Sequence, residues 1–98
     1  MNDRAGPKVA FVTGAGSGIG RAAATAFVRR GYATVLADVN GDAGKAAQAE
    51  LEPVGACSFV LCDVTDDDSV REAIAHTVAT FGPARSFTSV PPAWLEVG

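Results

Sequence analysis

The hydrophobic positions of this chain fall into short continuous runs separated by longer stretches of helical spacing. The continuous runs are Lys8 to Thr13, Thr34 to Asp38 and Ala56 to Cys62. Short apolar runs of this kind, bounded by turn-forming residues and without regular polar alternation, are typical of strands buried on both faces. The pattern therefore predicts three buried β-strands.

Each run is followed by a stretch in which apolar residues recur every three or four positions, as in an amphipathic helix. The predicted core-facing positions are Ile19, Ala22, Ala23, Ala26 and Phe27 in the first helix, Ala43, Ala46, Ala47 and Leu51 in the second, and Val70, Ala73, Ile74, Val78 and Phe81 in the third. Glycine or proline residues end all three helices. Thr65-Asp66-Asp67-Asp68 matches a capping box, which predicts that the Thr65 hydroxyl caps the third helix.

Three repeats of strand then helix predict an α/β fold with a parallel sheet, because parallel neighbours need a connection of helical length. We expect three to four parallel strands with flanking helices. Residues 1–83 are predicted to form a half-domain and residues 84–98 a divergent tail. Residues 84–90 are open between a weak fourth strand and an unpaired segment, and Pro91-Pro92 would block a longer strand.

Composition narrows the classes of function. Hydrophobic residues make up 48% of the 98 residues and charged residues 19%, which is typical of a packed domain. A net charge of -3 with scattered basic residues argues against nucleic-acid binding. No run is long enough to cross a membrane and the N-terminus has no export signal, so we expect no membrane partner and a cytoplasmic location.

Cys57 and Cys62 are the only cysteines and have no metal-ligand spacing, so they are predicted to be small buried hydrophobic residues. His76 is isolated between the apolar positions of the third helix and is predicted to lie on the solvated surface. The acidic run of residues 66–68 is expected to complement a helix dipole, and no metal site is predicted.

The segment with the clearest chemistry lies between the first strand and the first helix, and it reads Thr13-Gly14-Ala15-Gly16-Ser17-Gly18-Ile19-Gly20. Glycines permit a tight turn and a close approach of a pyrophosphate, whose negative charge is favoured at a helix N-terminus. A side chain at Gly18 or Gly20 is expected to occupy that approach. The alternative is that the glycines only turn the chain.

Asp38 lies at the end of the second strand, eighteen positions beyond Gly20. An acid near this offset accepts hydrogen bonds from the ribose hydroxyls of a dinucleotide, and its charge repels a 2′-phosphate. The sequence therefore predicts NAD as the cofactor in preference to NADP. The alternative is an acid that only caps a loop.

Together, Thr13-Gly14-x-x-x-Gly18-Ile19-Gly20, Asp38 and Cys62-Asp63-Val64-Thr65 resemble the N-terminal half of the short-chain dehydrogenase/reductase family over about residues 8 to 82. The resemblance implies a partial Rossmann fold with strand order 3-2-1 and a place for a fourth strand beside the first. It also implies that Asp63 accepts a hydrogen bond from the adenine amino group and that Val64 packs on the adenine face. Taken without the resemblance, Asp63 has the alternative role of a strand-end cap. The predicted cofactor-binding residues are Gly14, Ser17, Gly18, Ile19, Gly20, Asp38, Asp63 and Val64.

The same resemblance implies hydride transfer between a nicotinamide and a carbonyl or alcohol, but it predicts no catalytic residue in this chain. Where the family has Asn-Asn-Ala-Gly, this chain has Ser89-Val90-Pro91-Pro92. The family's serine and Tyr-x-x-x-Lys cannot be placed, because the only tyrosine is Tyr32, four residues before Leu36. We therefore expect a truncated oxidoreductase that is inactive alone, or a module that binds NAD or a partner without catalysis. An exposed sheet edge would favour homo-oligomers or aggregation.

Overall fold

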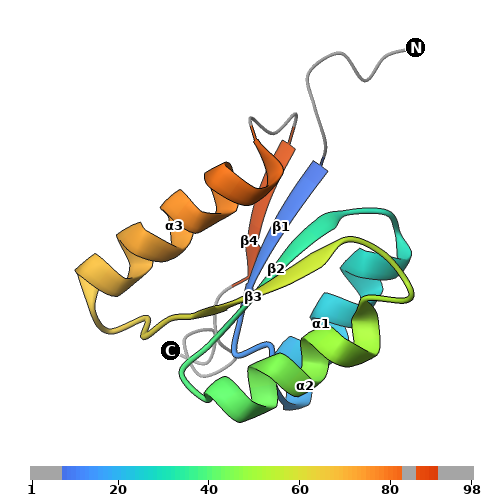
Figure 1. The fold of residues 1–98 in the computed structure, drawn as a ribbon, viewed down its shortest axis with the longest axis horizontal. Coiled ribbons are helices and arrows are strands. Elements are labelled where there is room, and N and C mark those ends of the chain that lie inside the picture. Colours follow the sequence, from blue (N-terminus) through green and yellow to red (C-terminus); the bar gives the residue numbers. More distant parts are fainter. Residues whose placement is uncertain (1–7, 83–85, 91–98) are drawn as a thin grey trace.

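The computed structural model describes residues 8–82 and 86–90, in which strands and helices alternate along the chain (Figure 1). The strands are β1 (Lys8–Thr13), β2 (Ala33–Asp38), β3 (Cys57–Leu61) and β4 (Ser86–Val90). The helices are α1 (Gly18–Arg29), α2 (Gly41–Leu51) and α3 (Asp67–Phe81). Residues 91 and 92, which were predicted to end the fourth strand, lie outside the described part of the chain.

The strands form one parallel sheet in the order β3-β2-β1-β4. This confirms the predicted α/β class and the 3-2-1 order, and β4 takes the fourth place beside β1. β1 is paired on both sides, since Val9 is in register with Ala33 of β2 and with Phe87 of β4. The edges of the described sheet are therefore β3 and β4. β1 would have been an exposed edge only if residues 84–90 had remained unpaired.

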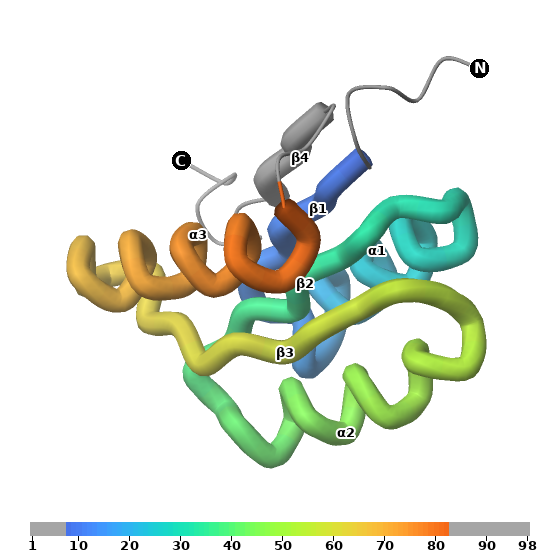
Figure 2. Tube along the Cα trace, turned by 45° about the horizontal axis from the view of Figure 1, so that its top comes forward, coloured from blue at the N-terminus to red at the C-terminus, as the bar shows by residue number. Residues whose placement is uncertain are grey.

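The chain reverses direction across the sheet at β1, and this reversal places the helices on opposite faces. β1, β2 and β3 follow one another outward with α1 and α2 on one face, and α3 then crosses the other face on the way to β4 (Figures 1 and 2). In doubly wound sheets a crevice opens at such a switch point, beyond the carboxyl ends of the strands. The topology thus singles out the ends of β1, β2 and β3 as the place for a ligand.

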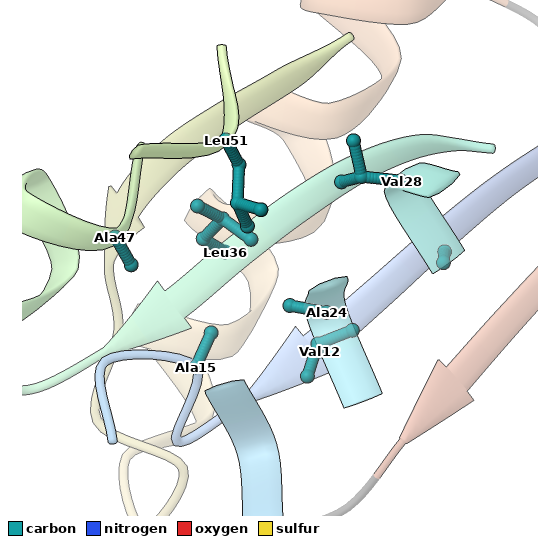
Figure 3. Close-up of a cluster of buried hydrophobic side chains, with 8 residues drawn as sticks. Val12, Ala15, Ala24, Val28, Leu36, Ala47 and Leu51 are labelled. Carbon is teal, nitrogen blue, oxygen red and sulfur yellow. The ribbon is translucent and has the colours of Figure 1, made fainter. Parts of the chain in front are cut away.

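Two apolar layers explain why the strand runs are continuously hydrophobic. Alternate residues of a strand point to opposite faces, and both faces of this sheet are covered by helices. One cluster joins the sheet to α1 and α2, as Figure 3 shows, and contains Ala10, Val12, Ala15, Ala24, Val28, Leu36, Ala47 and Leu51. The other joins the sheet to α3 and contains Phe11, Val35, Ala37, Cys62 and Ala73.

The buried stripes of two helices differ from the predicted ones. In α1 the buried residues are Ala24 and Val28, whereas Ile19 is 70% exposed and Ala22 and Ala26 are also exposed. Two of the predicted positions, Ala23 and Phe27, are partly buried and pack against the core cluster. The predicted face is therefore correct in part, and its centre lies at Ala24 and Val28.

In α3 the buried residues are Ala73 and Thr77, while Ile74 and Val78 are partly or largely exposed. Thr77 can be buried because its hydroxyl donates to the Ala73 carbonyl at 2.9 Å. Helix α2 follows its prediction more closely, since Ala47 and Leu51 are both buried.

The N-cap of α3 also differs from the prediction, because Asp66 and not Thr65 caps this helix. The Asp66 carboxylate accepts hydrogen bonds from the backbone N–H groups of Asp68 and Ser69. The Thr65 hydroxyl instead donates to Asp63 at 2.6 Å. Two neighbouring residues could each have served as the cap, and the hydrogen bond to Asp63 removed Thr65 from that role.

Candidate functional site

A pocket of about 340 Å³ opens at the carboxyl ends of β1, β2 and β3. This volume lies at the small end of the range for ligand sites, which is suited to part of a dinucleotide. The lining residues are Thr13, Gly14, Ser17, Asp38, Val39, Cys62, Asp63, Val64 and Thr65. Five predicted cofactor-binding residues therefore line one pocket, namely Gly14, Ser17, Asp38, Asp63 and Val64.

The glycine turn owes its shape to two left-handed residues. Gly14 has a φ of 65° and Gly18 a φ of 60°, a backbone region that other residues rarely adopt. Ser17 is the N-cap residue of α1, is exposed, and makes no side-chain cap hydrogen bond. The first N–H groups of a helix have no partner within the helix, so this end of α1 presents free donors to an anion at the pocket.

Gly20 is required for a different reason from the one predicted. A Cβ atom at this position would collide with the carbonyl of Gly14 and would lie 2.8 Å from the carbonyl oxygen of Thr13. The missing side chain therefore allows α1 to pack on its own turn, and a larger residue would strike the protein before it reached a ligand. At Gly18 a Cβ atom would meet open space, so its φ alone is the constraint.

Asp38 is held by two backbone N–H groups. Its Oδ2 accepts from Gly16 at 2.8 Å and its Oδ1 from Asn40 at 2.9 Å. These hydrogen bonds match the alternative role of a loop cap. They do not use up the carboxylate, because its two oxygens offer about four acceptor positions. Asp38 is half-buried at the wall of the pocket and can still accept from two hydroxyl groups.

Asp63 also combines a local role with a position in the pocket. Its Oδ1 accepts from the Thr65 hydroxyl at 2.6 Å and from the Thr65 N–H at 2.9 Å. These two hydrogen bonds lower the pKa of the Asp63 carboxyl below its ordinary value. The local cap is thus present, and it keeps the side chain ionised, so that within residues 8–82 its Oδ2 remains an acceptor.

The family model "short chain dehydrogenase" matches residues 8–86 of this chain. The chain belongs to the short chain dehydrogenase family. The match begins at β1, where the predicted resemblance begins, and extends four residues beyond its predicted end at residue 82.

Individual family members agree with this assignment. The chain is 47% identical to momilactone A synthase of Oryza sativa subsp. japonica, over 76% of this chain and 27% of that protein. It is 36% identical to L-fucose dehydrogenase of Bos taurus, over 98% of this chain and 36% of that protein. The crystal structure of hydroxysteroid dehydrogenase from Escherichia coli superposes with a TM-score of 0.77 at 28% identity, covering 82% of this chain and 33% of that one. This chain spans about a third of the length of such relatives.

One apolar pocket residue of this family member, Val39, was not predicted from the sequence. Val39 follows β2, is 63% exposed and lines the pocket together with the half-buried Val64. A valine directly after Asp38, beyond the end of the predicted second strand, is the sequence signal that could have revealed it. The two valines give the pocket apolar surface beside its two carboxylates.

Cys62 also lines the pocket, although it is only 2% exposed. Burial raises the pKa of its thiol, a hydrogen bond with the Ser69 side chain lowers it, and the Asp63 charge raises it further. The pKa of Cys57 is also raised, first by burial and then by the charge of Glu52. Both are free thiols, and the prediction of small buried hydrophobic residues is confirmed for Cys62, whereas Cys57 is only half-buried.

Other residues considered from the sequence lie away from the pocket. His76 is half-buried and not simply solvated, because its Nε2 lies 3.0 Å from the Ser58 hydroxyl. Tyr32 packs edge-on against Phe27 with ring centroids 4.9 Å apart. Among the described residues no group of three or more His, Cys, Asp or Glu side chains could hold a metal, and no helix is long and apolar enough to span a membrane.

Proposed function

We propose that this chain binds NAD(H) at the end of the cofactor that carries adenosine and pyrophosphate. It would thereby serve as the nucleotide-binding part of an oxidoreductase that moves a hydride between the nicotinamide and a carbonyl or alcohol. The observation that carries this proposal is that the Asp38 carboxylate and the glycine turn with Gly14 and Ser17 line the same pocket. Bound nicotinamide supplies the hydride chemistry, and the residues of this chain hold the rest of the cofactor.

Each predicted residue has a role in this proposal. The free N–H groups at the start of α1 bind the pyrophosphate, with Gly14, Ser17, Gly18, Ile19 and Gly20 forming the turn around it. Asp38 accepts from the ribose hydroxyls. Asp63 accepts from the adenine amino group, and Val39 and Val64 provide apolar surface for the ring.

The charge of the pocket favours NAD over NADP. Two unit charges 4 Å apart repel each other by about 4 kcal/mol at an effective dielectric constant of about 20. A 2′-phosphate beside Asp38 would meet such repulsion. The lining contains no Lys, Arg or His in the described part of the chain to offset it, and Asp63 adds a second negative charge. NAD, which has a hydroxyl at this position, avoids the cost.

Catalytic turnover by this chain alone is not part of the proposal. The chain contains one tyrosine, Tyr32, and no Tyr-x-x-x-Lys, and that tyrosine packs against Phe27 outside the pocket. The proposal is therefore cofactor binding without hydride transfer, which is also what a cofactor-binding module would show. We also propose a cytoplasmic location, because Cys57 and Cys62 are free thiols. Self-association through a sheet edge is proposed because β3 and β4 are the edges of the described sheet.

Fluorescence titration of NADH with the 98-residue chain tests the proposal. We expect saturable binding in the micromolar range and weaker binding of NADPH. Asp38→Ala should weaken NADH binding about tenfold, because it removes a charged acceptor of hydrogen bonds. Asp42→Ala removes a carboxylate from α2 outside the pocket lining and should change the Kd less than about threefold. Absence of saturable NADH binding, or equal affinity for NADH and NADPH, would contradict the proposal.

A further inference from the structure

Gly16 occupies a position at which the glycine motif accepts any residue. Among the glycines of the turn, only Gly20 has less space for an added Cβ atom. A Cβ atom at this position would lie 2.8 Å from Asp38 Oδ2 and 2.8 Å from the Ala43 Cβ. Carbon atoms do not approach one another so closely, because dispersion contacts between them are optimal at about 3.5 to 4.0 Å. The φ of Gly16 is not positive, so space and not backbone strain is what requires glycine here.

The backbone of Gly16 makes the contact that its missing side chain permits. Its N–H donates to Asp38 Oδ2 at 2.8 Å, across 22 positions of sequence. Asn40 holds the other carboxylate oxygen at 2.9 Å. The two donors together fix the orientation of the Asp38 carboxylate at the pocket wall.

Helix α2 cannot readily move away from a larger residue at position 16. Its N-cap residue is tied to the end of β2, because the Asn40 N–H donates to Asp38 Oδ1 at 2.9 Å. Further along α2, Gly44 lies against the ring of Phe59 in β3, with no room even for a methyl group. A side chain at position 16 would therefore displace the Asp38 carboxylate before it displaced the helix.

We infer that Gly16 is a positioning residue for Asp38 and so helps to decide the preference for NAD over NADP. This inference rests on the proposed binding of NAD(H). Gly16 acts through Asp38: its N–H orients the carboxylate that accepts from the ribose, and its missing Cβ leaves space for both Asp38 and Ala43. NADP gains nothing from that carboxylate, so a change at Gly16 affects the two cofactors unequally.

The test compares NADH and NADPH binding to Gly16→Ala in the 98-residue chain by fluorescence titration. NADH should bind about tenfold more weakly because an oriented charged hydrogen bond is lost, whereas the Kd for NADPH should change less than about threefold. The ratio of the two Kd values is the deciding readout. Partial unfolding lowers the apparent affinity for both cofactors by the same factor, because both bind the same folded chain, and so it leaves the ratio unchanged.

Two further variants make the test specific. Gly41→Ala adds the same methyl group at the start of α2, where the nearest atom is Leu61 Cδ1 at 3.9 Å, and should leave both Kd values unchanged. Ala43→Gly combined with Gly16→Ala removes the contact with the Ala43 Cβ and leaves the Ala43 backbone carbon at 3.1 Å, so the turn can shift by a few tenths of an ångström toward α2 and relieve the contact with Asp38. This double variant should bring NADH binding back to within about threefold of the original chain.

The outcomes separate the inference from the function on which it rests. If the unaltered chain binds neither cofactor, the proposed function fails and the role of Gly16 fails with it. If the unaltered chain prefers NADH and Gly16→Ala weakens both cofactors equally, or neither, the role of Gly16 is overturned while the proposed function stands. A fall in the NADH preference that Ala43→Gly reverses supports the inference.

Discussion

The side-chain oxygen of Gln48 in α2 accepts a hydrogen bond of 2.7 Å from the backbone N–H of Phe59 on the outer edge of β3. Ala56 and Cys62 form backbone hydrogen bonds with β2, because Thr34 N donates to Ala56 O and Cys62 N donates to Asp38 O. Backbone groups alternate in direction along a strand, so the Phe59 N–H points away from β2 toward the open edge. An exposed edge of this kind is a template for pairing with another chain. Gln48 covers part of that edge.

We predict that Gln48→Ala destabilises the chain and promotes its self-association. The Phe59 N–H would lose its acceptor at a half-buried position, at a cost of about 1 kcal/mol in the free energy of unfolding. Urea denaturation measures the stability and light scattering measures the association. Lys45→Ala, at an exposed position of the same helix, should change the free energy by less than about 0.5 kcal/mol and leave the molecular mass unchanged. Equal behaviour of the two variants would contradict this role of Gln48.

We predict that Gly20→Ala destabilises the fold itself, because the added methyl group clashes with the protein and not with the cofactor. Its methyl group would be forced against the backbone carbonyls of Gly14 and Thr13, which cannot rotate away as a side chain could. Overpacking of this kind costs about 3 kcal/mol. Thermal unfolding followed by circular dichroism measures the loss, with Gly41→Ala as the control that adds the same group at an ordinary van der Waals distance of 3.9 Å from Leu61. A Gly20→Ala chain as stable as this control would show that α1 can shift without penalty.

The pKa of the Asp63 carboxyl should lie below the ordinary value of about 3.9 for aspartate. The hydrogen bonds from Thr65 favour the charged form, so they stabilise the fold at pH values above about 3.9, and this contribution is lost as the pH falls through the lower pKa of the folded chain. Thr65→Val removes the hydroxyl and keeps the N–H, so it should move the pKa part of the way back. Carbon-detected NMR titration of the Asp63 carboxyl measures both values.

Thr25→Val is the matched control for that titration, since the Thr25 hydroxyl donates to the Arg21 carbonyl in α1, away from the pocket. This variant should leave the Asp63 midpoint where it was. An Asp63 pKa at or above the ordinary value in the unaltered chain would show that the Thr65 hydrogen bonds do not persist in solution.

Cys62 should react with a thiol reagent more slowly than Cys57 in the folded chain. Cys62 is buried and Cys57 half-buried, and the pKa of each thiol is raised by burial, which lowers the fraction of reactive thiolate. Cys57→Ser and Cys62→Ser allow each rate to be measured separately with a disulfide reagent at pH 8. In urea the two rates should rise and converge. A Cys62 rate that is the same with and without urea would mean that the pocket wall opens readily.

Much of the fold follows from local features of the sequence. Continuous apolar runs bounded by glycine and polar residues identified β1, β2 and β3, and their alternation with helical spacing implied a parallel sheet. The strand order now observed was implied by the family resemblance. The glycine turn, Asp38 and residues 62–65 were placed at strand ends, and parallel strands bring such ends to one edge. That is why five of the eight predicted residues meet in one pocket without any knowledge of distances.

The sequence pattern could not decide between neighbouring residues that suit the same structural role. In α1 the predicted positions Ala23 and Phe27 pack against the core, but the most buried residues are Ala24 and Val28. Thr65 and Asp66 are both good N-cap residues, and the hydrogen bond from Thr65 to Asp63 decided between them. These errors arise because sequence spacing indicates which residue types suit a position, whereas the contacts that form depend on the residues that the fold brings next to that position.

The sequence by itself determined the α/β class and the positions of the strands and of the glycine turn, because these depend on periodicity and on residue types next to one another. Only the tertiary structure decided how Asp38 is held by Gly16, 22 positions away, and how Gln48 covers Phe59. It also decided that Val39 lines the pocket. Such contacts join separate elements, so they arise only once α2 has packed on the sheet and brought these residues together.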